Sequence, residues 1–267
     1  MSESRVDRKL PKTGGAAVPV SAGTVWASEM PRNSDQVVID NSATGLMPGT
    51  PEFARLSRSL DTRSLGYRFF KRAFDIVFSG VVTVVGAIPC ALLAVVIALD
   101  TKGSPIYTQE RAGRFGKPFP IYKFRTMVAD ADDVEKYLSP EQLAEWRRER
   151  KVTNDPRITR LGRLLRKTSV DELPQFINVL AGQISVVGPR PVSFDELAHF
   201  GADAALLLSV PGGITGLWQV TTRNNATFES GERQEIELDY VCEASFQLDF
   251  RCLVGTFGAM FGKRSGR

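Results

Sequence analysis

Residues 76–99 read IVFSGVVTVVGAIPCALLAVVIAL, a run of 24 residues without a charged side chain. Folded as one α-helix, this run would be about 36 Å long, and the hydrocarbon core of a bilayer is roughly 30 Å thick. Its length and composition therefore predict a helix inserted in a membrane. The alternative is a helical hairpin in the core of a soluble protein, which the length of the run disfavours.

The run contains a proline, Pro89, just past its middle, and proline breaks or kinks a helix because it lacks a backbone donor. Basic residues at 68–72 precede the run, and in a spanning helix they would keep the N-terminus in the cytoplasm and send residues 100–267 outside. Residues 100–267 also carry many basic residues, and the chemistry indicated below uses a cytosolic substrate. We therefore predict a re-entrant, helix–break–helix segment over 66–102 that enters and leaves the membrane by one face.

The remaining sequence divides into a tail and a domain. Residues 1–60 are rich in Ser, Gly, Pro and Thr and lack an apolar run, which predicts a disordered N-terminal tail and no signal peptide. A docking or regulatory function of this tail is the alternative. We expect a basic flank and the re-entrant helix over 66–102 and a compact, membrane-associated catalytic domain over 103–267.

Composition narrows the classes of partner. The formal charge of +4 and the pI of about 9.0 suit an anionic lipid surface or a phosphorylated substrate. The sequence has no zinc-ligand spacing, helix–turn–helix pattern or RNA-binding aromatic signature, so we expect no nucleic-acid partner. Cys90, Cys242 and Cys252 form no C-x-x-C pair and are expected to be reduced, and one histidine, His199, leaves little scope for histidine-based catalysis.

The sequence after residue 103 predicts an α/β domain. The runs SPIYTQERAG (104–113) and KPFPIYKFRTM (117–127) predict two short strands joined by a glycine-containing turn at 113–116. The charged stretch 128–150 predicts a helix broken near Pro140. Within that stretch, Asp130 and Asp132 form a D-x-D pair, which either holds a metal ion or lies on an acidic helix face.

Two further segments predict amphipathic helices at the membrane surface. One has Arg157, Arg160, Arg163 and Arg166 at every third position, beside Ile158, Leu161 and Leu164. The other has Phe246, Phe250, Leu253 and Phe257 at helical spacing, followed by basic residues. A solvated helix face would also explain the first pattern, and core packing would also explain the second.

The stretch RKTSVDELPQ (166–175) carries the candidate chemistry. Asp171 as a helix N-cap would place Pro174 at the third helical position, where no internal hydrogen bond is lost. A helix N-terminus favours anions and binds phosphates. An ionised Asp171 could attack phosphorus there as a nucleophile, and a neighbouring carboxylate such as Glu172 could hold Mg²⁺. In isolation, Asp171 would read as a helix cap alone. The basic residues available to phosphates are Lys123, Arg125, Arg166, Lys167 and Arg190.

Arg190 stands between two prolines in Gly188-Pro189-Arg190-Pro191, so the backbone on both sides of it is fixed. This pattern predicts either a rigid structural turn or a phosphate clamp.

The motifs YKFRTM (122–127), SVDELPQ (169–175), VGPRP (187–191) and GITGLWQV (213–220) resemble, in this order, those of the bacterial sugar transferase family. These are monotopic phosphoglycosyl transferases, and the resemblance extends from about Gly66 to the C-terminus. It is closest to the small members that start exopolysaccharide assembly. It implies a helix–break–helix membrane segment and an α/β catalytic core on the cytoplasmic face of the bacterial inner membrane.

The resemblance also implies an activity. The enzyme would transfer hexose 1-phosphate from a UDP-sugar to undecaprenyl (polyprenyl) phosphate and release UMP, through a covalent aspartyl-phosphosugar intermediate with Mg²⁺ as cofactor. This is the first step of exopolysaccharide or glycoconjugate assembly. UDP-glucose or UDP-galactose is the expected donor, and downstream glycosyltransferases are candidate partners.

Carried over by position, the resemblance makes Asp171 the nucleophile and Asp171 and Glu172 the metal ligands. It places Lys123, Arg166 and Arg190 on phosphates, Arg223 and Asp239 on other substrate groups, and Pro89 at the helix break.

The sequence departs from the family pattern at three places. They are Pro211-Gly212-Gly213 for Arg-Pro-Gly, Thr221-Thr222 for Ser-Gly or Asn-Gly, and Ile88 for the serine before the membrane proline. The first departure favours an alternative, a catalytically weakened membrane-tethered homologue that binds partners of polysaccharide assembly.

Overall fold

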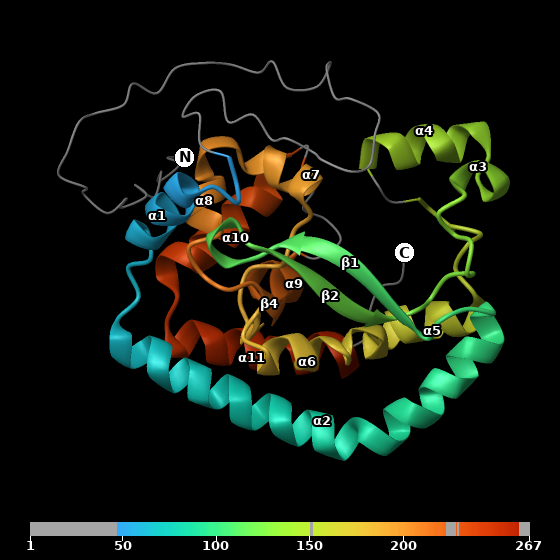
Figure 1. The fold of residues 1–267 in the computed structure, drawn as a ribbon, viewed down its shortest axis with the longest axis horizontal. Helices are drawn as coiled ribbons and strands as arrows, with labels where there is room; N and C mark the ends of the chain where they lie inside the picture. The colour runs from blue at the N-terminus through green and yellow to red at the C-terminus, as the bar shows by residue number, and fades with distance from the viewer. Residues whose placement is uncertain (1–46, 150–151, 223–227, 229, 262–267) are drawn as a thin grey trace, which may run out of the picture.

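The computed structural model describes residues 47–149, 152–222, 228 and 230–261 (Figure 1). They form a mixed helix-and-sheet fold that lies on one long apolar helix, as the sequence predicts. In chain order the elements are α1 (Pro51–Ser59), α2 (Leu65–Thr101), β1 (Ile106–Ala112), η1 (Arg114–Gly116), β2 (Pro118–Phe124), α3 (Val134–Tyr137), α4 (Pro140–Glu149), α5 (Arg160–Thr168), η2 (Val170–Glu172), α6 (Gln175–Leu180), β3 (Ser185–Val187), α7 (Phe194–Leu197), η3 (Ala198–Asp203), α8 (Ala204–Leu207), β4 (Gly213–Thr215), α9 (Leu217–Thr221), α10 (Glu232–Glu243) and α11 (Phe246–Phe261).

The strands form two small sheets. β1 and β2 make an antiparallel hairpin that pairs Ile106 with Phe124 and Ala112 with Pro118, which confirms the predicted strands and turn. β3 and β4 are parallel, with Ser185 opposite Gly213. Buried side chains from β2, β3, α6, α10 and α11 share one apolar cluster, so the two sheets and the C-terminal helices pack as one body.

Helix α2 is the long apolar element that the sequence predicts. It begins at the Ser64 cap and ends at Lys102, which adopts a left-handed conformation. Pro89 lies inside the helix and deprives the Val85 carbonyl of its usual donor. The helix nevertheless continues through Pro89, and Figure 1 shows it bowed rather than interrupted.

The N-terminal half of α2 is bonded to the domain by polar contacts. The guanidinium of Arg72 donates to the carbonyls of Val179 and Leu180 at 2.6 and 2.9 Å, and thereby caps the end of α6. The Asp75 carboxylate accepts from the Ser185 hydroxyl and from the Val186 backbone N–H on β3, both at 3.0 Å. These bonds leave Asp75 buried and paired.

The C-terminal end of α2 returns to the same domain. Ile97 is buried in a cluster with Phe124 of β2 and Leu165 of α5. The Thr101 carbonyl accepts from the Ala129 backbone N–H at 3.1 Å. Since both ends contact one domain, only the middle of the helix stands away from it (Figure 1).

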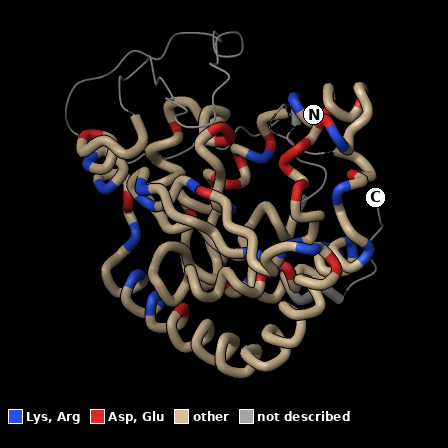
Figure 2. The backbone as a smooth tube through the Cα atoms, turned by 45° about the vertical axis from the view of Figure 1, so that its right-hand side comes forward, with Lys and Arg blue, Asp and Glu red and all other residues tan. Residues whose placement is uncertain are grey.

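The apolar side chains of α2 face outward, and only 6% of an apolar stretch of 18 residues within this helix is buried. Figure 2 shows the middle arc of α2 free of charged residues, with basic and acidic residues near its ends and on the domain above. By length and composition, α2 is the one helix in the described residues that could cross a membrane. The exposed large apolar residues are Leu65, Phe69, Phe70, Phe74, Ile76, Val77, Val81, Val84, Val85, Ile88, Leu92, Val95, Val96 and Leu99 on α2, Leu164 on α5, Ile177 on α6, and Phe246, Phe250 and Val254 on α11.

Helix α1 lies where the sequence predicted the end of a disordered tail. Thr50 caps it, Pro51 occupies its first position, and Phe53 and Ser57 are fully buried against the domain. The prediction of disorder over 1–60 is therefore wrong for 51–59, while residues 1–46 lie outside the described residues.

The predicted arginine stripe begins one turn too early. Helix α5 starts at Arg160 after the Thr159 cap, so Arg157 is not on it. Arg157 is instead buried and donates to Asp155 at 2.6 and 2.9 Å and to the Ala131 carbonyl at 3.0 Å. Arg163 and Leu164 lie exposed on α5, as the amphipathic pattern predicts.

The D-x-D pair is not arranged as a metal site. The exposed carboxylate of Asp130 accepts from Lys136 and, at 2.7 Å, from the Tyr137 hydroxyl. These bonds lower the pKa of Asp130 to about 2. The predicted break near Pro140 is confirmed, because α3 ends at Tyr137 and α4 begins at Pro140.

Candidate active site

The candidate nucleophile lies in a tight turn rather than at a helix cap. Ser169 ends α5 in a left-handed conformation with φ of 58°, and the 3₁₀ turn η2 follows. Helix α6 begins only at Gln175, after Pro174, and no side chain caps it. The prediction that Asp171 is the N-cap is therefore wrong, because the reversal at Ser169 puts Asp171 and Glu172 inside η2.

Asp171 is 9% exposed and lies among groups of both charges. Burial raises the pKa of its carboxyl, and the neighbouring Glu172 carboxylate raises the pKa further. The charges of Lys123 and Arg166 oppose this rise. Asp171 is thus a buried carboxyl whose ionised form depends on nearby cations.

Glu172 joins three segments that lie far apart in the sequence. Its Oε1 atom accepts from Lys123 Nζ on β2 at 3.1 Å and from both terminal nitrogens of Arg190 at 3.4 Å. Burial lowers the pKa of Lys123, and Glu172 opposes that effect. Burial also disfavours the charge of Arg190, but the carboxylates of Glu172, Glu196 and Glu237 outweigh it and raise the pKa of Arg190.

The loop that carries Arg190 rests on β4. The Gly188 N–H donates to the Thr215 carbonyl at 2.9 Å, and the Gly213 N–H donates to the Pro189 carbonyl at 2.7 Å. A Cβ at Gly213 would lie 2.1 Å from the Gly188 nitrogen, so this position admits no side chain. The close approach of the two backbones holds the loop at the edge of the β3–β4 sheet.

Arg166 reaches the site from α5, where its Nε donates to the Thr126 hydroxyl at 2.9 Å. Helix α5 lies directly on the backbone after β2, since a Cβ on Gly162 would be 2.0 Å from the Thr126 carbonyl oxygen. Lys123, Arg166, Asp171, Glu172 and Arg190 are therefore brought together, as the sequence predicts.

Of the two remaining predicted substrate residues, the structure describes only Asp239, which does not join this group. Asp239 is exposed on α10, and Arg223 lies outside the described residues. Glu237, two positions before Asp239 and on the opposite face of α10, is fully buried and accepts from the Arg190 backbone N–H at 3.1 Å. Sequence reasoning missed Glu237, although its neighbours Leu238 and Val241 mark the buried face of this helix.

A second row of charges continues behind Arg190. Arg111 on β1 donates to Glu196 at 2.7 Å, and Arg233 on α10 lies 3.9 Å from the same carboxylate. The Arg233 guanidinium also stacks over the Trp218 and Phe228 rings, 4.4 and 4.0 Å from their centroids.

Asp171 and Glu172 are the two carboxylates of this group that could hold a magnesium ion. The described residues contain no group of three or more acidic, histidine or cysteine side chains close enough to hold a metal alone. Mg²⁺ commonly uses one or two carboxylates and completes its shell with waters and substrate phosphates. The mutual repulsion that raises the pKa of Asp171 is the kind of contact that such a cation relieves.

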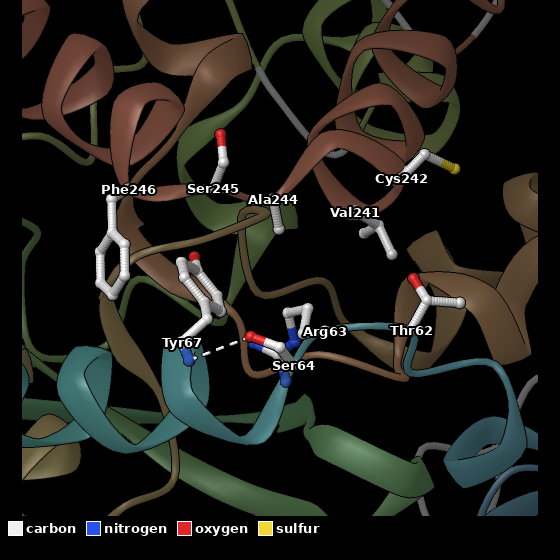
Figure 3. A pocket seen from close by; sticks show the side chains of 9 residues that line it. All are labelled: Thr62, Arg63, Ser64, Tyr67, Val241, Cys242, Ala244, Ser245 and Phe246. Atoms are coloured by element: carbon white, nitrogen blue, oxygen red, sulfur yellow. Dashed lines mark hydrogen bonds between the residues drawn. The ribbon is translucent and has the colours of Figure 1, made fainter.

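A separate cavity of about 370 Å³ lies between the α1–α2 connection and the corner of α10 and α11 (Figure 3). Ser64 caps α2 at its edge by accepting from the Tyr67 N–H, and Arg63 there is bonded to Asp61 at 2.8 and 3.1 Å. None of its lining residues belongs to the charged group around Asp171.

Residues 66–263 match the family described as bacterial sugar transferase. The chain belongs to the bacterial sugar transferase family.

Its relatives include proteins of two sizes. The undecaprenyl-phosphate galactose phosphotransferase of Salmonella typhimurium is 45% identical over 66% of this chain and 37% of its own length. The UDP-galactose-lipid carrier transferase of Erwinia amylovora is 41% identical over 79% of this chain and 44% of its own length. The chain thus spans less than half of these two relatives. The exopolysaccharide production protein ExoY of Rhizobium meliloti is 37% identical over 71% of this chain and 84% of its own length.

Proposed function

We propose that this bacterial sugar transferase moves a hexose 1-phosphate from a UDP-sugar to a polyprenyl phosphate, such as undecaprenyl phosphate, and releases UMP. The observation that carries the proposal is the buried Asp171 carboxylate. Its neighbour Glu172 is contacted by Lys123 and Arg190. A buried carboxylate flanked by cations suits attack on an anionic diphosphate, because the cations offset the repulsion between nucleophile and substrate.

In the first half-reaction, a carboxylate oxygen of Asp171 attacks the phosphorus that carries the sugar. A new P–O bond to Asp171 forms, the P–O bond to the other phosphate breaks, and UMP leaves with the electron pair. The product on the enzyme is an aspartyl-phosphosugar.

In the second half-reaction, a phosphate oxygen of the polyprenyl phosphate attacks the same phosphorus. The bond to Asp171 breaks, the carboxylate is restored, and a polyprenyl diphosphate sugar leaves. Both half-reactions use one site, so UMP must depart before the lipid phosphate is held there.

The chain's own cations would serve both half-reactions. Lys123 and Arg190 approach Glu172 from β2 and from the proline-flanked loop, and Arg166 is held by Thr126 on the side of α5. They would bind phosphate oxygens and orient the diphosphate for in-line attack.

Asp171 and Glu172 would hold Mg²⁺, which would supply positive charge to the diphosphate. If this proposal is right, excess EDTA abolishes UMP release and added Mg²⁺ restores it. Full activity in EDTA would show that the lysine and arginines suffice.

Helix α2 would insert re-entrantly at the cytoplasmic face of the inner membrane. Arg72 and Asp75 bond one half of the helix to the domain, and Ile97 buries the other end against the same domain. A spanning helix of 37 residues would carry its ends about 55 Å apart on opposite sides of the bilayer. The exposed apolar residues of α5, α6 and α11 would extend the lipid-facing surface.

Two of the relatives described above are named for galactose, so UDP-galactose is the first donor to test and UDP-glucose the second. Purified protein in nanodiscs would be given each UDP-sugar with undecaprenyl phosphate, and UMP release would be measured. We expect UMP and a lipid-linked sugar from at least one donor. If no UDP-sugar yields UMP, the chain is the catalytically weakened homologue that the Pro211 departure favours.

A further inference from the structure

The Gly-Pro-Arg-Pro loop has one backbone donor between its prolines. Residues 189–191 read Pro-Arg-Pro, and proline has no backbone N–H, so the Arg190 N–H is the sole donor of this stretch. That donor is used by a side chain, because it bonds to Glu237 Oε2 at 3.1 Å.

Glu237 is an unusual partner for this donor. It lies on α10 with its residue fully buried, and its other oxygen, Oε1, has no hydrogen-bond partner within the described part of the chain. Burying a carboxylate is costly unless nearby charges and hydrogen bonds compensate for the lost water. A glutamate that only filled the core would make the protein less stable than a leucine at the same position, so the burial of Glu237 requires another explanation.

The surrounding charges supply that explanation. The charge of Arg190 lowers the pKa of Arg111 and of Arg233, and the charge of Arg111 also lowers the pKa of Arg233. Glu196 contacts Arg111 and Arg233. Glu237 lies near Arg190 and Arg233, whose charges favour its ionised form against the cost of burial.

The guanidinium end of Arg190 faces Glu172, the neighbour of the proposed nucleophile Asp171. Both terminal guanidinium nitrogens lie 3.4 Å from Glu172 Oε1, a distance at the long limit of a hydrogen bond. So weak a contact does not by itself fix the side chain. The direction of Arg190 therefore depends on where its backbone is held.

We propose that Glu237 is a positioning residue for the transfer reaction: its buried carboxylate anchors the Arg190 backbone so that the guanidinium faces Glu172 and the substrate diphosphate. This inference rests on the proposed function for its chemical consequence but not for the anchoring itself.

The anchoring is tested by hydrogen–deuterium exchange of the peptide that spans 187–193, in full-length protein in nanodiscs without substrate. Glu237→Leu should speed exchange of the Arg190 amide about tenfold or more, since the amide loses its acceptor. Glu237→Asp retracts the carboxylate by one methylene and should give a smaller increase, whereas Glu237→Gln keeps an acceptor oxygen and should preserve protection. Unchanged exchange in both Glu237→Leu and Glu237→Asp would overturn the proposal.

A double-mutant cycle tests the link to the reaction. In the parent, Glu237→Asp should lower kcat/KM for UMP release about tenfold, and in an Arg190→Met background it should have less than about a twofold effect, because the anchored group is gone. Equal losses in both backgrounds would show that Glu237 acts through stability alone and would overturn the positioning role. Glu235→Gln, on the exposed face of α10, is the matched control and should change neither measurement.

The two tests separate two kinds of failure. A parent protein that releases no UMP from any UDP-sugar contradicts the proposed function, while the exchange experiment still decides whether Glu237 anchors the loop.

Discussion

Lys123 Nζ on β2 lies 3.1 Å from Glu172 Oε1 on η2. The strand and the turn are 49 positions apart in the sequence, and this contact places a cation from the hairpin beside the carboxylate next to Asp171. The same lysine lowers the pKa of Asp171, while Glu172 raises it. Lys123 therefore influences both the shape of the site and the ionisation of the proposed nucleophile.

Replacing this cation should change the pH dependence of the reaction. The reactive form of Asp171 is the carboxylate, and loss of the Lys123 charge raises the pKa of Asp171, so Lys123→Met should move the acid limb of kcat/KM to higher pH. Activity at the optimum should fall about 10²-fold, since a charged group near the diphosphate is lost. Lys123→Arg keeps the charge and should leave the acid limb in place. A Lys123→Met profile with an unmoved acid limb would argue against this electrostatic role.

A substitution on α5 should disturb the site through packing. A Cβ at Gly162 would lie 2.0 Å from the Thr126 carbonyl oxygen, so Gly162→Ala must push α5 away from Thr126, whose hydroxyl accepts from Arg166. We expect a loss of about 1–3 kcal/mol in the free energy of unfolding, seen as a lower Tm, together with reduced UMP release. Gly258→Ala on α11 meets no atom within 4 Å and is the control. A Gly162→Ala protein as stable and active as this control would mean that α5 is not packed as described.

The buried Glu237 carboxyl should make stability depend on pH. Burial raises its pKa from 4.5 to about 7, with the Arg190 N–H and the charges of Arg233 and Arg190 opposing the rise. A raised pKa in the folded state means that its contribution to stability is fully present below about pH 4.5 and is lost as pH rises through about 7. Glu237→Gln cannot ionise, so its Tm relative to the parent should increase between these pH values and level off above them. The corresponding change in the free energy of unfolding is at most about 3 kcal/mol. A Tm difference that stays constant with pH would contradict the raised pKa.

How far the sequence predicted this fold differs from element to element. The β1–β2 hairpin was predicted from two runs of strand-forming residues and a glycine-containing turn, which are local signals. Helix α2 was predicted because its uncharged run is longer than a helix in a soluble core usually is. Helix α1 was missed because its segment is polar on average. Thr50 followed by Pro51 is a helix-start signal, but the burial of Phe53 depends on residues more than 100 positions away in α8 and its neighbours.

In the candidate active site, too, sequence motifs predicted which residues take part, and the fold was needed to show how they are arranged. Asp171, Glu172, Lys123, Arg166 and Arg190 could be named because each stands in a recognisable motif. The position of Asp171 within η2 could not be predicted. It depends on the left-handed conformation of Ser169, which is unusual for a residue other than glycine and which tertiary contacts must stabilise. Glu237 stands among the solvent-exposed acids of α10 in the sequence, and only the fold shows that it accepts from the Arg190 N–H, 47 positions away.

The proposed topology of α2 can be tested by labelling. Single cysteines would be placed at Ser59 and Ser139, which are exposed on the domain, in a protein whose three native cysteines are replaced. We expect a membrane-impermeant maleimide to label neither position from outside intact spheroplasts and to label both after lysis. Labelling of one position alone from outside would mean that α2 spans the bilayer. Pro89→Ala, which restores the missing helical hydrogen bond, should shift part of the protein toward that spanning state.

The most direct measurement of the central claim is the intact mass of the protein after incubation with UDP-galactose or UDP-glucose and Mg²⁺, without any lipid acceptor. The account predicts a mass gain of one hexose phosphate on Asp171, one equivalent of UMP, and loss of the adduct when undecaprenyl phosphate is added. Asp171→Asn should show neither the adduct nor UMP while keeping its fold. A parent protein that releases UMP only when lipid is present and never carries the adduct, or an Asp171→Asn protein that still forms it, would contradict the assignment of Asp171 as the nucleophile.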